Sequence, residues 1–294
     1  LLEGHLEVKN PLFIIGTGRS GSTIFHQILS YHPNVAWLSS LCARYPGNPR
    51  LNRLAMHLID APLLARYVRK VIYPGEWYPF WDYHCLGFSE PCRDLHKEDV
   101  SRKAKATIRK VMSQMLTTKR HRLLVKVTGW PRTGFLKEIF PDAKFIHIYR
   151  DGRAGANSFL NVHWWSGWRG PDNWRWGELT PEQKEKWEKY SRSFVVLAGI
   201  EWEILMAAQE SAKQQIPLSD LLEIRYEDLC QNPIKTFQTA AKFSALEWSP
   251  QFEAVVKSFP LKNANHKWQE HLSDVQQKML HECLEDTLQK YGYS

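Results

Sequence analysis

Short apolar segments alternate with longer helical patterns along almost the whole chain, and this alternation limits the folds open to it. Five segments rich in β-branched, leucine and aromatic residues are expected to be strands: 12–15, 35–38, 123–127, 145–149 and 221–224. Helical periodicity predicts helices over residues 23–30, 51–71, 98–117, 154–161, 182–212, 234–244 and 274–291. Strands that are apolar on both faces are typical of a parallel sheet covered on each side by helices. We therefore predict a three-layer α/β fold with a central parallel sheet of about five strands.

The composition is that of one globular unit with an anionic partner. Hydrophobic residues make up 43% of the 294 residues and charged residues 24%, which excludes a disordered, collagen-like or coiled-coil protein. No repeat, low-complexity tract or linker is visible, so we expect a single domain over residues 1–294. The net charge of +8 indicates a negatively charged ligand or substrate.

Cysteine usage and hydropathy indicate a cytoplasmic protein without a membrane partner. The five cysteines are irregularly spaced and form no CxxC pair, so neither a disulfide framework nor a zinc site is expected. The longest apolar runs, such as residues 194–200, are too short to span a bilayer. The chain starts at Leu1 and shows no leader, although a leader or anchor removed before Leu1 would not be seen.

Two aromatic segments interrupt the alternation. Residues 73–96 and 161–180 are rich in turns and lack periodicity, and five of the 13 tryptophans lie between positions 164 and 176. Long irregular segments in a compact domain are often binding loops. A loop anchored by its own aromatic cluster and a lid over an acceptor pocket are both open as explanations.

The first strand leads into a glycine-bearing turn and then a helix, and this junction carries the strongest chemical signal. Residues 12–23 read LFIIGTGRSGST. Gly16 and Gly21 permit a tight turn that directs backbone N–H groups and the positive end of a helix dipole to one point. The segment therefore predicts a binding site for an anionic group.

This turn differs from the phosphate loop of nucleoside triphosphatases, which reads GxxxxGK[ST]. Ser22 occupies the position of the lysine, and Arg19 supplies the positive charge from inside the turn. Asp151, the candidate for a magnesium-binding acid at a second strand end, follows an arginine instead. A kinase-like enzyme of the same fold, which would need magnesium and ATP, is therefore the alternative rather than the preferred function.

A second anionic site is expected at the end of the strand over residues 145–149. Arg150 follows this strand directly, and Ser158 lies eight residues later, about two helical turns into the next helix. A guanidinium and a hydroxyl that converge on one point suit a terminal phosphate. Together with the first turn, they predict a ligand with two separated anionic groups.

These motifs resemble the sulfotransferases that use 3′-phosphoadenosine 5′-phosphosulfate (PAPS). The family's [KR]-[ST]-G-[ST]-[ST] loop is matched by Arg19, Ser20, Gly21, Ser22 and Thr23, and its strand-end arginine and following serine by Arg150 and Ser158. Its YED-L segment is matched at Tyr226–Leu229, and Lys267-Trp268 is similar to the bacterial and tyrosylprotein branches. The resemblance covers residues 11–291.

The resemblance implies a P-loop-like fold, a PAPS cofactor and a role for each matched residue. Residues 19–23 would bind the 5′-phosphosulfate, Arg150 and Ser158 the 3′-phosphate, and Tyr226 would lie near the adenine. Lys267 is assigned to the same nucleotide site. The implied function is transfer of the sulfuryl group of PAPS to a hydroxyl or amine, with 3′,5′-ADP as the second product.

The chain departs from the family at the position of the general base. Ile24 replaces a tryptophan that stacks on adenine in the cytosolic enzymes, and no histidine base follows a central lysine. The glutamate of the tyrosylprotein branch would fall near Ser39-Ser40. The usual bases are therefore missing from their usual places.

The remaining catalytic groups are assigned from the chemistry of sulfuryl transfer. Arg19 would stabilise the leaving phosphate, and Lys126, which is costly in an apolar strand without an anionic partner, resembles the family's strand-end lysine at the sulfuryl group. Glu76, among aromatic residues in YPGEWYPFW, is the first candidate for the base. His84 with Asp82, and then His163, follow, and each is also explained as a surface loop residue.

The expected acceptor is a small molecule, because the two tryptophan-rich segments favour an aromatic or amphipathic compound over a polysaccharide. No metal-ligand cluster is visible, so no metal is expected. A basic nucleic-acid-binding protein is the competing class, but it leaves Arg19 and Arg150 unexplained. Binding of 3′,5′-ADP rather than an oligonucleotide would separate the two classes.

Overall fold

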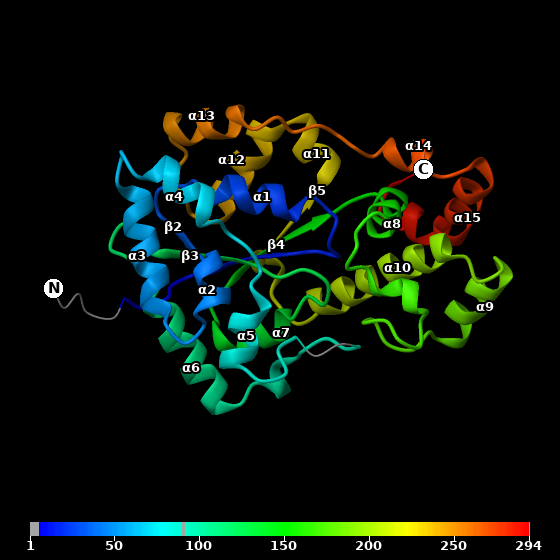
Figure 1. Ribbon diagram of the computed structural model, residues 1–294, viewed down its shortest axis with the longest axis horizontal. Coiled ribbons are helices and arrows are strands. Elements are labelled where there is room, and N and C mark those ends of the chain that lie inside the picture. The colour runs from blue at the N-terminus through cyan, green and yellow to red at the C-terminus, as the bar shows by residue number, and fades with distance from the viewer. Residues whose placement is uncertain (1–5, 90–91, 294) are drawn as a thin grey trace.

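The computed structural model describes residues 6–89 and 92–293 and has a five-stranded sheet at its centre (Figure 1). The strands are β1 (Leu12–Ile15), β2 (Val35–Trp37), β3 (Arg122–Lys126), β4 (Lys144–Tyr149) and β5 (Leu221–Arg225). Their order is β2-β3-β1-β4-β5, and every neighbouring pair is parallel. The predicted α/β fold with a central parallel sheet is therefore confirmed. The expected domain over residues 1–294 and the segment 73–96 each include positions outside the described residues.

Burial explains why the strands are apolar on both faces. All four residues of β1, the central strand, are at most 3% exposed, and the strands on either side of it, β3 and β4, are also largely buried. The Phe13 ring stacks on Phe145 of β4 at a centroid distance of 5.6 Å. A side chain on either face of the sheet thus contacts a helix layer rather than water, which is the environment that continuous apolar strands need.

Fifteen α-helices are present in the described part of the chain. They are α1 (Ser22–Leu29), α2 (Ser40–Arg44), α3 (Pro49–Asp60), α4 (Ala65–Val71), α5 (Tyr78–His84), α6 (Arg102–Ser113), α7 (Thr133–Ile139), α8 (Gly152–Leu160), α9 (Pro181–Lys189), α10 (Phe194–Lys213), α11 (Tyr226–Gln231), α12 (Pro233–Phe243), α13 (Pro250–Ser258), α14 (Lys267–His271) and α15 (Asp274–Lys290). Helices α1, α12 and α13 lie on one side of the sheet, and α6 and α7 lie on the other (Figure 1).

Two of the predicted long helices are each divided into two. The segment 51–71 breaks after α3, because Ala61 is extended and precedes Pro62, and a residue before proline disfavours the helical conformation. The segment 182–212 breaks between α9 and α10, where Ser191 and Arg192 have φ values of 53° and 56°. Ser193 then caps α10 by accepting a hydrogen bond from the Val195 N–H.

Other predicted boundaries also change. The helix expected over 98–117 is α6, which starts after the cap residue Ser101. The segment 73–96, expected to be irregular, contains α5, with Pro79 in its first turn. Short helices such as α2, α7 and α11 were not predicted, because five to seven residues are too few to show a helical period.

The side chains form two hydrophobic clusters. One surrounds the sheet, and the other gathers residues of α8, α10 and α15 with two tryptophans of the segment 161–180. Helix α10 packs against both α8 and α15, and these helices lie together at one end of the molecule (Figure 1). The carboxyl ends of β1, β3 and β4 lie between the two clusters, where ligands bind in parallel α/β sheets.

Candidate functional site

The turn between β1 and α1 has the geometry of an anion-binding loop. Gly21 directly precedes α1 with φ 88° and ψ 2°, and no side chain caps the first N–H groups of the helix. Arg19 also lies in the left-handed region, at φ 54°, a conformation that costs a non-glycine residue free energy and is found mainly at functional sites. The Ser20 hydroxyl is buried and has no hydrogen-bond partner in the described part of the chain. The loop thus presents unpaired donors at a helix N-terminus, which fits an anionic group.

Close packing joins the YED segment to this loop. A β-carbon at Gly21 would overlap the ring of Tyr226, the first residue of α11. The Tyr226 hydroxyl donates to the Lys262 carbonyl at 3.0 Å, and the guanidinium of Arg150 lies 4.3 Å from the centre of the Tyr226 ring. Glycine is therefore required at position 21 both by the backbone conformation and by the neighbouring ring.

Arg19, Arg150 and Ser158 lie together, although 139 residues separate the first from the last. The Arg19 Nε donates to the Ser158 Oγ at 2.9 Å, and the Arg150 Nη1 donates to the Arg19 carbonyl at 3.2 Å. Burial and the charge of Arg150 hold the pKa of Arg19 below its ordinary value. Two neighbouring guanidinium groups disfavour each other's charge, and an anion bound between them would relieve that cost.

The segment before α14 completes this side of the site. Asn265 accepts from the Arg150 Nε at 2.8 Å and donates to Glu227 at 2.5 Å. Lys267 begins α14 two residues later, and its side chain is exposed. Asn265 therefore orients Arg150 directly, and Lys267 lies beside that contact at the surface.

Lys126 connects the anion loop to a second group of residues. Its ammonium, at the end of β3, lies 2.9 Å from the Thr23 Oγ1 and 2.9 Å from the Glu76 Oε1. The residue is only 8% exposed. The Thr128 hydroxyl also donates to the Glu76 Oε1. The buried lysine thus has the anionic partner that its place in an apolar strand requires.

Glu76 is held at the carboxyl end of β2 by backbone contacts. Ser39 forms an antiparallel bridge with Pro74, and the Gly75 N–H donates to the Leu38 carbonyl at 3.3 Å. The Trp77 Nε1 donates to the same carbonyl at 2.9 Å. These contacts bring Glu76 beside Ser39, where the tyrosylprotein branch would carry its glutamate.

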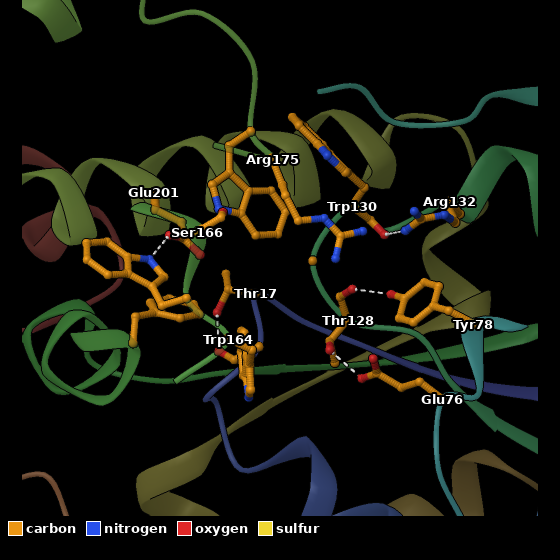
Figure 2. Close-up of a pocket in the computed structure, with 15 residues that line it drawn as sticks. Thr17, Glu76, Tyr78, Thr128, Trp130, Arg132, Trp164, Ser166, Arg175 and Glu201 are labelled. Atoms are coloured by element: carbon orange, nitrogen blue, oxygen red, sulfur yellow. Dashed lines mark hydrogen bonds between the residues drawn. The ribbon is translucent and has the colours of Figure 1, made fainter. Parts of the chain in front are cut away.

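Glu76, the ion-pair partner of Lys126, lines a cavity of about 240 Å³ (Figure 2). Its walls come from the ends of β1 and β3, the segment before α5, the tryptophan-rich segment, and helices α8 and α10. The lining residues are Thr17, Gly18, Glu76, Tyr78, Thr128, Gly129, Trp130, Arg132, Phe159, Trp164, Trp165, Ser166, Arg175, Trp176 and Glu201. Six of the fifteen lining residues are aromatic, and the charged ones are Glu76, Arg132, Arg175 and Glu201.

The sequence comparison decides the family to which this site belongs. Residues 11–250 match the profile of the Sulfotransferase family, and the match includes the anion loop, Lys126, Arg150 and Tyr226. The chain belongs to the sulfotransferase family. No curated protein sequence matches it at a significant level.

Solved sulfotransferases share the fold of this family member. The sulfotransferase STF9 from Mycobacterium avium is 16% identical, with a TM-score of 0.59, over 98% of this chain and 78% of that one. STF1 from Mycobacterium tuberculosis H37Rv is 16% identical, with a TM-score of 0.52, over 95% and 77%. The sulfotransferase domain of the Synechococcus PCC 7002 olefin synthase is 16% identical, with a TM-score of 0.50, over 100% and 98%. At these identities the similarity shows the fold alone.

In this sulfotransferase, some tryptophans of the segment 161–180 anchor it, as the first explanation expects, and others line the cavity. Trp165 and Trp174 are 3% and 5% exposed and anchor the segment in the second hydrophobic cluster. Trp164 and Trp176 line the cavity, and Trp164 remains 54% exposed at its edge. The buried rings therefore fix the loop, and the remaining rings form a wall of the cavity.

The histidine candidates for the base lie outside the lining of the cavity. His84, in the last turn of α5, makes a hydrogen bond with the Pro46 carbonyl at 2.8 Å, and burial lowers its pKa. Asp82 accepts from the Ser89 N–H at 2.9 Å. His163 is exposed. Of the four base candidates, Glu76 alone lines the cavity.

Sequence reasoning missed three residues of the site. Glu201 directly follows the apolar run 194–200, which is a detectable signal because a buried acid needs a partner. Thr128 directly follows a predicted strand. Because ligands bind at the carboxyl ends of parallel strands, the sequence does indicate this residue. Asn265 carries no local signal, since its role depends on the fold of the segment before α14.

Residues 6–89 and 92–293 contain neither a cluster of metal ligands nor a membrane-spanning helix. No group of three or more His, Cys, Asp or Glu side chains in these ranges is arranged to hold a metal ion. No helix among them is long and apolar enough to cross a membrane.

Proposed function

We propose that this protein transfers the sulfuryl group of PAPS to a hydroxyl or amine of a small molecule held in the aromatic cavity. The observation that carries the proposal is the position of Lys126, whose ammonium lies 2.9 Å from both Thr23 of the anion loop and Glu76 of the cavity. A group transferred from the loop to the cavity would pass this ammonium. PAPS supplies the reactive sulfuryl group, and the protein supplies positioning and charge.

The anionic groups of the nucleotide find complementary donors in the fold. The backbone N–H groups of residues 19–23 and the unpaired Ser20 hydroxyl suit the 5′-phosphosulfate. Arg150 and Ser158 suit the 3′-phosphate. Arg19 contacts each of these residues: its carbonyl accepts from Arg150, and its guanidinium donates to Ser158. Tyr226, which packs on Gly21, borders the same site, and Lys267 is assigned to its outer edge.

Two cations would stabilise charge during the transfer. Arg19 donates to the leaving phosphate as charge develops there, and it keeps its proton because a guanidinium is a very weak acid. Lys126 faces the sulfuryl oxygens from the end of β3. Interactions that strengthen in the transition state raise turnover rather than ground-state binding.

Glu76 is assigned as the base that takes the proton of the acceptor. Its Oε1 is held by Lys126 and Thr128, and the residue lines the cavity. The bridge between Ser39 and Pro74 supports this assignment, because it joins the segment that carries Glu76 to the position at which the family's glutamate is expected. A carboxylate from a different segment of the chain thus acts as the base at the same position in the site.

The nucleotide assignment is tested by comparing two ligands that differ only in the 3′-phosphate. Calorimetry is expected to show that 3′,5′-ADP binds about 10–100-fold more tightly than 5′-AMP, because a charge-assisted hydrogen bond contributes about 1.5–3 kcal/mol. Arg150→Ala should reduce this ratio to near one, while Arg175→Ala, a cavity arginine on another segment, should leave it unchanged. Equal affinities of the two nucleotides for the wild-type protein would refute the assignment.

A further inference from the structure

Glu201 is a buried acid that the proposed transfer reaction does not use. It lies in α10, is 0% exposed and lines the cavity. In Figure 2 it lies on the opposite side of the cavity from Glu76, with Thr17 and Thr128 between them. A carboxyl group buried in an apolar helix costs free energy unless its oxygens are satisfied.

Only one of the two carboxyl oxygens is satisfied. Oε2 accepts a hydrogen bond from the Trp165 Nε1 at 2.5 Å. Oε1 is buried and has no partner in the described chain, residues 6–89 and 92–293. Burial raises the pKa of Glu201 to about 8, against the opposing effects of Trp165 and Trp176, so the carboxyl holds a proton at neutral pH. Since Oε2 is an acceptor, the proton belongs on Oε1, which is then a donor without an acceptor.

The neighbouring tryptophans add further unpaired donors. The Nε1 groups of Trp130 and Trp176 are buried and have no partner among the described residues, and both side chains line the same cavity. The Trp176 N–H acts on the Glu201 carboxyl as a donor that lowers its pKa, but it lies outside hydrogen-bonding geometry. The Arg132 guanidinium is already bound to the carbonyls of Phe88 and Trp130. This part of the wall therefore offers donors and lacks a partner that would accept from them.

We propose that Glu201 recognises the acceptor: its carboxyl donates a hydrogen bond to an oxygen at the end remote from the group that receives the sulfuryl. The substrate class is then an uncharged, flat, mostly apolar molecule with two oxygen functions, one facing Glu76 and one facing Glu201. The aromatic side chains Tyr78, Trp130, Phe159 and Trp164 enclose its apolar body. The inference rests on the proposed function only in naming this molecule as the sulfuryl acceptor.

An uncharged molecule fits this end of the cavity better than an anion. Glu201 forms no ion pair with a lysine or arginine among the described residues. Two arginines line the cavity elsewhere: Arg132 is bound to the carbonyls of Phe88 and Trp130, and Arg175 donates to the Ser89 carbonyl at 3.5 Å. Neither arginine affects the pKa of Glu201, so a carboxylate beside Glu201 would have no counter-ion placed there, which is costly in an apolar setting.

Matched naphthols test the proposal. Affinities of 2-naphthol, 2,6-dihydroxynaphthalene, 2,7-dihydroxynaphthalene and 6-hydroxy-2-naphthoate are measured by tryptophan fluorescence on the full chain, with and without saturating 3′,5′-ADP. At least one diol is expected to bind about tenfold more tightly than 2-naphthol, the equivalent of one buried hydrogen bond. The naphthoate should bind no better than 2-naphthol.

Two variants separate recognition from a structural role. Glu201→Leu removes the donor and should bring the ratio of diol to naphthol affinity to near one. Glu201→Gln should keep most of the ratio, because its amide oxygen still accepts from Trp165 and its N–H still donates. Infrared difference spectra should show a protonated carboxyl band, absent from Glu201→Gln, that shifts when the diol binds and not when 2-naphthol binds.

Each outcome bears on the proposal. A wild-type ratio near one for both diols, an unchanged ratio in Glu201→Leu, preferential binding of the naphthoate, or no protonated carboxyl band would overturn it. If Glu201→Leu does not fold, the infrared band and the glutamine variant decide. Failure of 3′,5′-ADP to bind would count against the proposed function alone, since the naphthol affinities are also measured without nucleotide.

Discussion

The position of the Glu76 carboxylate depends on contacts with residues far away in the sequence. Lys126 and Thr128 hold one oxygen of its carboxylate, and the bridge at Ser39 fixes the segment that carries it. The resemblance to the tyrosylprotein branch implies that a glutamate after the segment 32–35 would be the base. A base at this site depends on where a carboxylate lies, and less on which segment supplies it.

Replacing Glu76 by glutamine tests this role. Glu76→Gln keeps the shape of the side chain and removes its basicity, so turnover should fall by about 10²–10⁴-fold while the affinity for 3′,5′-ADP is kept. His84→Ala is the control, because His84 contacts the Pro46 carbonyl outside the cavity lining and should change turnover little. Steady-state kinetics and calorimetry measure the two quantities. Near-normal turnover in Glu76→Gln with an inactive His84→Ala or His163→Ala would assign the base to a histidine.

Glu201 also makes stability depend on pH. Its pKa is raised in the folded protein from an ordinary value of 4.5 to about 8, so the folded state binds more protons than the unfolded state between these pH values. Stability is therefore lost as the pH rises through this window, by up to roughly 1.4 kcal/mol per pH unit. Glu201→Gln has no titrating proton at this position. The free energy of unfolding of the variant minus that of the wild type should therefore increase from pH 5 to pH 8. Urea unfolding at several pH values measures the difference, and a difference that does not vary with pH contradicts the argument.

At the scale of elements, the loop between β1 and α1 depends on contact with α11. Gly21 adopts φ 88°, and the ring of Tyr226 fills the space that a β-carbon would need. Gly170 offers a matched comparison, because it has φ 78° and no heavy atom within 4 Å of the equivalent position. Both glycines have a positive φ, but ψ is 2° at Gly21 and 169° at Gly170, and only Gly21 has the close neighbour.

Alanine substitutions at these glycines should therefore differ. Gly170→Ala should lose stability through its backbone conformation and keep its affinity for 3′,5′-ADP. Gly21→Ala should lose at least tenfold in 3′,5′-ADP affinity, because either the loop or Tyr226 must move. Calorimetry measures the affinities, and thermal unfolding shows that both variants fold. Equal 3′,5′-ADP affinities in the two variants would show that the contact with Tyr226 is unimportant.

At the scale of the whole molecule, the cavity lies where the two hydrophobic clusters meet. Its lining combines Tyr78, which packs on the sheet cluster, with Phe159 and Trp165 of the second cluster. The residues proposed to bind the nucleotide likewise come from the loop after β1, the end of β4, α8 and α11. A ligand at this junction contacts both clusters and therefore stabilises their arrangement.

Nucleotide binding should raise the thermal stability of the whole chain. At about 100 times its dissociation constant, 3′,5′-ADP adds about 2.7 kcal/mol to the free energy of unfolding, or roughly 5 °C in melting temperature. 5′-AMP at the same concentration should give a much smaller shift, because Arg150 and Ser158 lose their phosphate. An oligonucleotide is the control for the net charge of +8 and should give no comparable shift. Stabilisation by the oligonucleotide alone would favour the nucleic-acid-binding class.

Local patterns in the sequence were sufficient for the sheet, the anion loop and the strand-end arginine. Strands β1 to β4 are largely buried on both faces, so their apolar character appears in consecutive residues, whereas the edge strand β5 is only partly buried. The loop over residues 16–23 is likewise local, since its conformation depends on glycines within it. The helix over 51–71 was predicted without its break, although Pro62 was visible in the sequence.

Only the tertiary structure decided which side chains share the cavity. Glu76 meets Lys126 across 50 residues, and Glu201 meets Trp165 across 36. Periodicity shows whether a residue is buried, but not what it is buried against, because contacts between elements depend on how whole layers pack. Glu201 on its own is an unexplained acid in an apolar helix, and the unpaired oxygen beside two unpaired tryptophan N–H groups exists only once α10 lies against the loops that follow β3 and α8.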